Sequence, residues 1–303
     1  MNVRFNSPFE ADGLWLKGNL HTHSTASDGV RSPQDLINHY AENEYDFLSI
    51  TDHGLMVDPS DLAAGRMLLI PGEEICVGKS EAGTQWHIVG VGIKNQIPLK
   101  DFNPEVPPQN AIDMIADLDG ISIIAHPYWS GLNHRDLINL EGYLGIEIYN
   151  TSCDIYRNLG YSSPHIDALL ATGKSPLIFA TDDHHGTPEP MKPSDACGAW
   201  IMVRAKELTA DEVLKAIRRG LFYASTGPEI KEIRCEESGL TVKTSPVRSI
   251  SFISTPSLGA KFISPDGNMA EYTYQGREKE TYLRIEATDQ LGRTAWSNPI
   301  MIE

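Results

Sequence analysis

Short apolar segments alternate with amphipathic stretches through about the first 220 residues of the chain. Eight segments have the length and composition of buried strands: GNLH, DFLSIT, MLLIPGEE, HIVGVGI, ISIIAH, GIEIYN, LIFAT and AWIMV. Helix signals lie between them. Ser32 precedes Pro33 ahead of DLINHYAENE, and Thr209 with Glu212 forms a capping box before a helix that Gly220 ends. This alternation predicts an α/β fold with a largely parallel sheet.

The pattern changes after Gly227 and Pro228, where β-type segments follow one another: TVKTS, SISFIST, YTYQG and YLRIEATDQLGRTAWSNPIMI. From Leu283 to Thr288, apolar and polar residues alternate as they do in a half-buried strand. We therefore predict two domains. Residues 1–228 form the larger α/β domain, and residues 229–303 form a small C-terminal antiparallel β-sandwich.

Composition and charge narrow the class of protein. The chain has 25 Lys and Arg against 41 Asp and Glu, a net charge of −16. We expect no nucleic-acid scaffold and no anionic membrane as partner, because both require a basic surface. The 4 cysteines lie far apart without a Cys-x-x-Cys pair, which excludes a disulfide-stapled fold. Neither a signal-type apolar region nor a membrane-length one is present, so we expect a cytoplasmic protein of undetermined oligomeric state.

Histidines and carboxylates gather at the C-terminal ends of successive predicted strands, in NLHTH, SITDHG, PGEE, IIAHP and ATDDHH. In a closed β/α barrel these strand ends meet at one face, where such folds place their active sites. Imidazole and carboxylate groups suit zinc, manganese or iron. His21 and His23 point to the same side of a strand, so both can reach one ion. Asp28 precedes Gly29 in a segment that is typical of a plain turn or of a turn that returns a carboxylate to the site.

Together, HTHSTASDG, TDHG, PGEEI followed by WHIVG, IIAHP and TDDH resemble the motif set of the PHP (polymerase and histidinol phosphatase) superfamily of metal-dependent phosphoesterases. WLKGNLHTHSTASDG and GLFYASTGPEI are similar to its CehA/McbA-like branch. The resemblance spans residues 15–230 and covers the C-terminal part only loosely. It implies a distorted (β/α)7 barrel with two or three divalent ions of manganese, iron or zinc at the strand ends.

The resemblance also implies a set of metal ligands, carried over motif by motif. These are His21, His23, Asp28, His53, Glu74, His87, His126, Asp182 and His184. Glu74 rather than Glu73 is the implied bridging carboxylate, and successive strand residues face opposite ways. The sequence TDDHH leaves the last pair ambiguous by one residue, because Asp183 and His185 also fit the motif. Asp52 is expected to orient a neighbouring ligand.

Clustered divalent ions lower the pKa of a bound water and stabilise charge on phosphoryl oxygens, which suits phosphate-ester hydrolysis. We predict a phosphoesterase that acts on a small phosphorylated metabolite or nucleotide through a metal-bound hydroxide. The catalytic residues of this prediction are His21, His23, Glu74, His126 and Asp182. Its substrate-contact candidates, for each of which an ordinary surface role stays open, are His134, Arg135, Arg157, His185 and Lys192.

Two other functions remain open at this point. The same hydroxide can attack a carbonyl, so the second hypothesis is a hydrolase of carbamate or carboxyl esters. A third reading is a binding module that keeps its metals without turnover. The chain contains no Gly-rich phosphate loop and no Gly-x-Ser-x-Gly elbow, so a nucleotide kinase or a serine hydrolase has no support.

Overall fold

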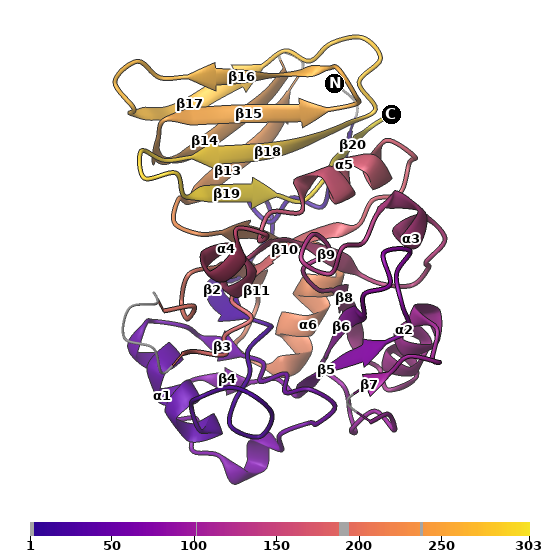
Figure 1. Cartoon of the computed structure of the whole chain (residues 1–303). Helices are drawn as coiled ribbons and strands as arrows, with labels where there is room; N and C mark the ends of the chain where they lie inside the picture. The colour runs from indigo at the N-terminus through magenta and orange to yellow at the C-terminus, as the bar shows by residue number, and fades with distance from the viewer. Residues whose placement is uncertain (1–2, 101, 188–193, 237–238) are drawn as a thin grey trace.

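The computed structural model describes residues 3–100, 102–187, 194–236 and 239–303. In these residues the strands form three sheets, flanked by short helices (Figure 1). The helices are α1 (Pro33–Glu42), a 3-10 turn (Pro59–Asp61), α2 (Pro108–Asp117), α3 (His134–Ile138), α4 (Thr151–Arg157), α5 (Ser163–Leu170) and α6 (Ala210–Arg218). None of the helices in the described part of the chain is long and apolar enough to cross a bilayer.

The largest sheet has eleven strands and runs in the order β1-β20-β18-β19-β12-β11-β2-β3-β4, with β15 added to β18 and β16 to β15. It combines strands from both ends of the chain. Its strands are β1 (Val3–Arg4), β2 (Leu14–Asn19), β3 (Phe47–Leu48), β4 (Leu68–Leu69), β11 (Trp200–Ala205), β12 (Phe222–Ser225), β15 (Ser249–Ser254), β16 (Gly259–Ile263), β18 (Tyr282–Thr288), β19 (Thr294–Ser297) and β20 (Ile300–Ile302).

The second sheet has six strands in the order β10-β9-β8-β6-β5-β7, and the third has three in the order β13-β14-β17. The strands of the second sheet are β5 (Gly72–Val77), β6 (Trp86–Val91), β7 (Phe102–Asn103), β8 (Ile121–Ile124), β9 (Gly145–Asn150) and β10 (Leu177–Thr181). Those of the third are β13 (Ile230–Glu236), β14 (Gly239–Val247) and β17 (Met269–Tyr274).

The helix boundaries follow the signals in the sequence. The Ser32 side chain accepts a hydrogen bond from the backbone N–H of Asp35 at the start of α1. Thr209 accepts one from the N–H of Glu212 at the start of α6, and Gly220 adopts a φ of 72° just beyond that helix. These start and stop predictions are confirmed.

The predicted α/β class holds, but the distorted (β/α)7 barrel is not confirmed. The sheets are mixed: β8, β9 and β10 run parallel, whereas β6 is antiparallel to both β5 and β8, and β11 is antiparallel to β2. For β5 and β6 the reason lies in the loop 78–85 between them, which is too short for the crossover that parallel neighbours need.

Two isolated parallel bridges connect the eleven-stranded and six-stranded sheets. One pairs Thr22, just after β2, with His184, just after β10, and the other pairs His53 with Glu74. Buried apolar side chains from both sheets, such as Ile88, Ile148 and Val203, form one hydrophobic core. The two sheets therefore meet beside Glu74 on β5 and at the segments that follow β2, β3 and β10, which is where the histidine motifs lie.

The C-terminal strands continue the eleven-stranded sheet, because β19 pairs with β12 and β20 pairs with β1. Figure 1 shows β13, β14 and β17 packed against β15 and β18 as a second layer. Val242 of β14, Phe252 of β15 and Ile285 of β18 share one buried cluster, as the two layers of a sandwich do. The division into residues 1–228 and 229–303 stays a prediction.

Candidate metal centre

Ten side chains with metal-ligating atoms converge at the junction of the two sheets. They form overlapping groups in which the ligand atoms lie within 4.8 Å of one another: His21, His23, Asp28, His53, Glu74, Cys76, His87, His126, Asp183 and His185. Because they come from β5, β6 and the segments after β2, β3, β8 and β10, the fold brings together residues from distant parts of the sequence.

Glu74 lies at the centre of this cluster, with its side chain 1% exposed. Its two carboxylate oxygens lie 2.9–3.4 Å from ring nitrogens of His21, His23, His53, His87 and His126. Glu73 faces the other way along β5, and its Oε2 accepts a hydrogen bond from the N–H of Ile97 at 3.0 Å. Strand alternation thus places Glu74, and not Glu73, where a bridging carboxylate is expected.

The segment after β10 places Asp183, not Asp182, in the cluster. Asp183 Oδ1 lies 3.2 Å from His21 Nε2 and 3.1 Å from His23 Nε2. His185, which stacks on the His23 ring, belongs to the cluster in place of His184. The prediction of Asp182 and His184 is therefore one residue early. The cause is a left-handed backbone at Asp183, with a φ of 53°, which interrupts the alternation of the strand.

The two displaced residues have structural contacts of their own. Asp182 is fully buried and accepts five hydrogen bonds, from Tyr40 Oη, Thr151 Oγ1 and the backbone N–H groups of residues 197–199. Burial raises the pKa of Asp182 to about 6, although these donors act in the opposite direction. His184 pairs with Asp195 at 2.5 Å. Asp182 therefore anchors the segment before β11 instead of facing the cluster.

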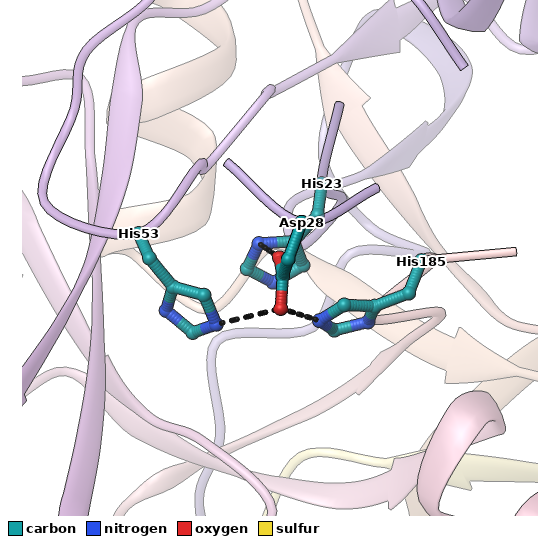
Figure 2. Close-up of side chains that lie close together, drawn as sticks. All are labelled: His23, Asp28, His53 and His185. Atoms are coloured by element: carbon teal, nitrogen blue, oxygen red, sulfur yellow. Dashed lines mark ion pairs between the residues drawn. The ribbon is translucent and has the colours of Figure 1, made fainter. Parts of the chain in front are cut away.

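Asp28 completes the outer side of the cluster. Figure 2 shows its carboxylate lying between the rings of His53 and His185, with His23 behind it; Oδ2 is 3.7 Å from His53 Nε2 and 3.4 Å from His185 Nε2. Asp28 is 54% exposed on its side chain, so this side of the cluster is open to solvent. The turn that follows the first motif thus returns the carboxylate to the site.

Asp52 shapes that turn. Its carboxylate accepts hydrogen bonds from the backbone N–H and hydroxyl of Ser24 and from the N–H and hydroxyl of Ser27. It therefore contacts the loop that carries Asp28 and not a histidine ring. The expectation that Asp52 orients a neighbouring ligand stays a prediction, with this loop as its contact.

Glu147 on β9 was missed by the sequence analysis. It is buried, and its Oε1 accepts a hydrogen bond from His21 Nδ1 at 2.7 Å and from the Thr181 hydroxyl at 2.6 Å. Its Oε2 accepts from the N–H of His126 at 2.8 Å. With Nδ1 of His21 donating to Glu147, Nε2 is the atom turned toward the cluster. The signal was a lone carboxylate in the otherwise apolar GIEIYN segment.

The buried carboxylates of the cluster need nearby positive charge, as the pKa shifts of His21 and Glu74 indicate. Burial lowers the pKa of His21, but Asp183, Glu74 and Glu147 outweigh it and raise this pKa well above its ordinary value. Burial raises the pKa of Glu74, yet the surrounding histidines, His21 first, hold it well below its ordinary value. Either protonated rings or bound cations must balance the buried carboxylates.

Three buried atoms of the cluster have no hydrogen-bond partner among the described residues: Glu74 Oε2, Asp183 Oδ1 and His23 Nδ1. Buried polar atoms in proteins are normally paired, and unpaired ones call for an explanation such as an ion. Nitrogen and carboxylate donors in this arrangement fit a divalent transition metal. The residues present therefore fit a metal centre.

A cavity of about 520 Å³ opens onto the cluster. Of the predicted substrate contacts, Arg157 and His185 line it. His134 and Arg135 begin α3 outside this lining, with Arg135 Nη1 3.9 Å from Glu81. Lys192 lies outside the described residues. The sequence analysis missed Trp129, whose ring packs edge-on against those of His87 and His126, and Tyr156, which also lines the cavity.

Comparisons with known proteins agree with this architecture. A two-domain protein from Bacteroides vulgatus that contains a predicted PHP-like metal-dependent phosphoesterase matches with a TM-score of 0.51 and 17% identity, over 91% of each chain. The chain thus has the fold of PHP-like metal-dependent phosphoesterases, as the sequence motifs implied. The CehA/McbA-like branch stays a prediction, and no family model matches the chain.

Two further matches are nucleases. A 5'-3' exoribonuclease from Haemophilus influenzae is 35% identical over 89 residues, which are 27% of this chain and 31% of that protein. The chain therefore spans under a third of the length of this curated relative. Endonuclease Q from Pyrococcus furiosus matches with a TM-score of 0.45 and 17% identity, over 68% of this chain and 56% of that one.

The expectation that nucleic acid is excluded as a partner is wrong. An exoribonuclease is 35% identical over 89 residues, and a complex of Endonuclease Q with a 27-mer duplex that carries an abasic lesion at its active site is among the structural matches, with a TM-score of 0.46. The exclusion rested on the net charge of −16. Net charge is a poor guide here, because cations held by buried carboxylates can meet phosphate groups in place of Lys and Arg.

Proposed function

We propose that this chain, which has the fold of PHP-like metal-dependent phosphoesterases, hydrolyses phosphate esters with the help of two to three divalent ions of manganese, iron or zinc. The observation that carries the proposal is the buried group of His21, His23, Glu74 and Asp183, whose ligand atoms lie within 4.8 Å of one another. Two of its carboxylate oxygens have no hydrogen-bond partner among the residues that the structure describes.

The proposed ligands divide into three neighbouring groups around Glu74. His21, His23, Glu74 and Asp183 form the first; Glu74, His87 and His126 the second; His23, Asp28, His53 and His185 the third. Divalent ions bound there would activate a water molecule and stabilise negative charge on the phosphoryl oxygens. Glu147 would hold His21 in the tautomer that presents Nε2.

The walls of the cavity favour a phosphate ester that carries an aromatic or nucleobase group. Trp129 and Tyr156 supply aromatic rings beside the cluster, and Arg157 at the end of α4 supplies a cation. A cavity of about 520 Å³ accommodates a group of mononucleotide size. Base–aromatic stacking is a common means of holding single-stranded nucleic acid. We therefore propose nucleotides, including the terminal nucleotide of a nucleic-acid strand, as the substrate class.

A substrate panel tests this proposal. The purified chain, supplied with Mn²⁺, Fe²⁺ or Zn²⁺ in turn, would be assayed on p-nitrophenyl phosphate, mononucleotides, 5'-phosphorylated oligonucleotides and aryl carbamates. We expect release from phosphate esters, greatest with nucleotides, and its loss with EDTA. Turnover confined to carbamates or carboxyl esters would contradict the proposal, as would no turnover in a metal-loaded protein.

A matched pair of variants distinguishes hydrolysis at this site from hydrolysis by a contaminating enzyme. His21→Ala removes a buried ring from the cluster and should lower hydrolysis by at least about a hundredfold. His39→Ala removes a half-buried ring on α1 that does not belong to the cluster, and it should retain the wild-type rate. Equal rates in the two variants would show that the activity does not come from this site.

A further inference from the structure

Cys76 lies in the metal centre, although no sequence motif pointed to it. It follows Glu74 by two residues on β5, so both side chains face the cluster. The residue is 4% exposed. Its Sγ lies 3.6 Å from His53 Nδ1 and 3.6 Å from His87 Nε2, so that a thiol and two imidazoles converge on one point.

The distances fit a tetrahedral metal site. With metal–sulfur and metal–nitrogen bonds of about 2.3 and 2.1 Å, neighbouring sulfur and nitrogen ligands lie about 3.6 Å apart. The distances from Cys76 Sγ to His53 Nδ1 and to His87 Nε2 have this value, and His87 Nδ1 lies 3.8 Å from the same sulfur. Glu74 Oε2, a buried atom without a hydrogen-bond partner among the described residues, lies beside this group, 3.2 Å from His53 Nδ1.

The ordinary alternative is a buried thiol that makes weak hydrogen bonds to the two rings. That arrangement satisfies the thiol but leaves Glu74 Oε2 without a hydrogen-bond partner beside it. A cation at the point where Cys76, His53 and His87 converge would bind the sulfur and the imidazole nitrogens together and would lie near this carboxylate oxygen. The negative charge of this buried carboxylate therefore favours a cation beside it.

We propose that Cys76, His53 and His87 form a thiolate-containing subsite of the metal centre that takes a borderline-soft ion, Zn²⁺ or Fe²⁺, in preference to Mn²⁺ or Mg²⁺. The inference rests on the metal centre of the proposed function but not on its substrate. The Cys76 thiol releases its proton to solvent as the metal–sulfur bond forms. Soft thiolate ligands select zinc and iron, whereas oxygen ligands suit manganese and magnesium.

Absorption spectroscopy of the protein with bound Co²⁺ tests this subsite without any assay of activity. The full-length protein would be titrated with Co²⁺ without oxygen, and we expect a near-ultraviolet thiolate-to-cobalt charge-transfer band that Cys76→Ser abolishes. Cys153→Ser is the matched control and should keep the band, because the buried Cys153 thiol lies 3.9 Å from an Asp183 carboxylate oxygen and outside the imidazole group. A band that persists in Cys76→Ser, or is lost in Cys153→Ser, would overturn the assignment.

The same titration separates the two proposals. Visible cobalt bands without the charge-transfer band would leave the metal centre in place and refute the thiolate subsite. No cobalt bands at all would refute both. Should Cys76→Ser fail to fold, X-ray absorption at the zinc edge of the wild-type protein gives the answer: we expect a sulfur scatterer at about 2.3 Å, and nitrogen and oxygen scatterers alone would contradict it.

Metal preference gives an independent readout. Cys76→Ser should lower the affinity for Zn²⁺ by at least about tenfold, since loss of a donor in or next to a metal site has effects of this size. Its affinity for Mn²⁺ should stay within a factor of about two, because manganese gains little from a thiolate. An equal fall for the two ions would indicate a general distortion of the site and contradict the selective role.

Discussion

The C-terminal strands are joined to the rest of the molecule by a buried ion pair whose strength can be measured. Arg284 on β18 has a side chain only 2% exposed. Its Nε and Nη2 donate to the two carboxylate oxygens of Asp167 on α5 at 2.6 and 2.7 Å, and its Nη1 donates to Glu286 at 2.5 Å. The paired donors give a bidentate contact of the strongest type.

The two partners differ in what their removal leaves behind. Asp167→Asn leaves a nearly fully buried guanidinium with Glu286 as its remaining carboxylate. Loss of one partner from a buried pair costs about 3–5 kcal/mol, and the remaining Glu286 contact reduces this to about 2–3 kcal/mol. Arg284→Met leaves carboxylates whose side chains are 32% and 23% exposed, so water can reach both. With an apolar side chain filling the space, we expect a cost of about 1 kcal/mol.

Urea unfolding of the full-length variants at neutral pH would measure both values. Glu212→Gln serves as the control, because its partner Lys215 is 59% exposed and such pairs contribute under about 1 kcal/mol. We expect Asp167→Asn to be the least stable of the three proteins. If Arg284→Met proved less stable than Asp167→Asn, or if both matched the control, the reasoning from burial would be refuted.

Four other outcomes are expected. Glu74→Gln should lose at least one bound ion and most activity, whereas Glu73→Gln should keep its full metal content; elemental analysis of the pair decides this. Asp183→Asn should likewise lose metal, whereas Asp182→Asn should keep it. The free energy of unfolding of Asp182→Asn, measured with urea, should fall by about 1–3 kcal/mol, because the new amide N–H groups face hydrogen-bond donors. The wild-type protein in EDTA should be less stable, by about 2.7 kcal/mol, than the same protein in metal at one hundred times its Kd; thermal unfolding under the two conditions measures the difference. A fragment that ends at Pro228 should aggregate in light scattering, since it exposes the edge of β12 that pairs with β19.

The fold could be predicted to the level of class from hydrophobic pattern and helix caps. The sheet order could not. Strand direction at β5 and β6 depends on the loop 78–85, whose length forbids a parallel crossover, and the resemblance to a barrel family favoured the opposite arrangement. The eleven-stranded sheet depends on pairing between the two ends of the chain, which no local pattern reveals.

The candidate site could be predicted where strand alternation continues and could not where it stops. Alternation correctly separated Glu74 from Glu73. It failed at Asp183, because a single left-handed residue changes which side chains face inward. Cys76 was within reach of the same rule, since it lies two residues beyond Glu74, but a lone cysteine carried no motif. Glu147 contacts His21, which lies 126 residues earlier in the chain, and only the tertiary structure brings the two together.

Anomalous diffraction from crystals of the metal-loaded protein tests the central claim most directly. Data collected on both sides of the absorption edge of the bound metal locate each ion without reference to activity. We predict at least two anomalous peaks in contact with Glu74, one of them also in contact with Asp183 and none in contact with Asp182. A fully active crystal with no peak among these side chains would contradict the account.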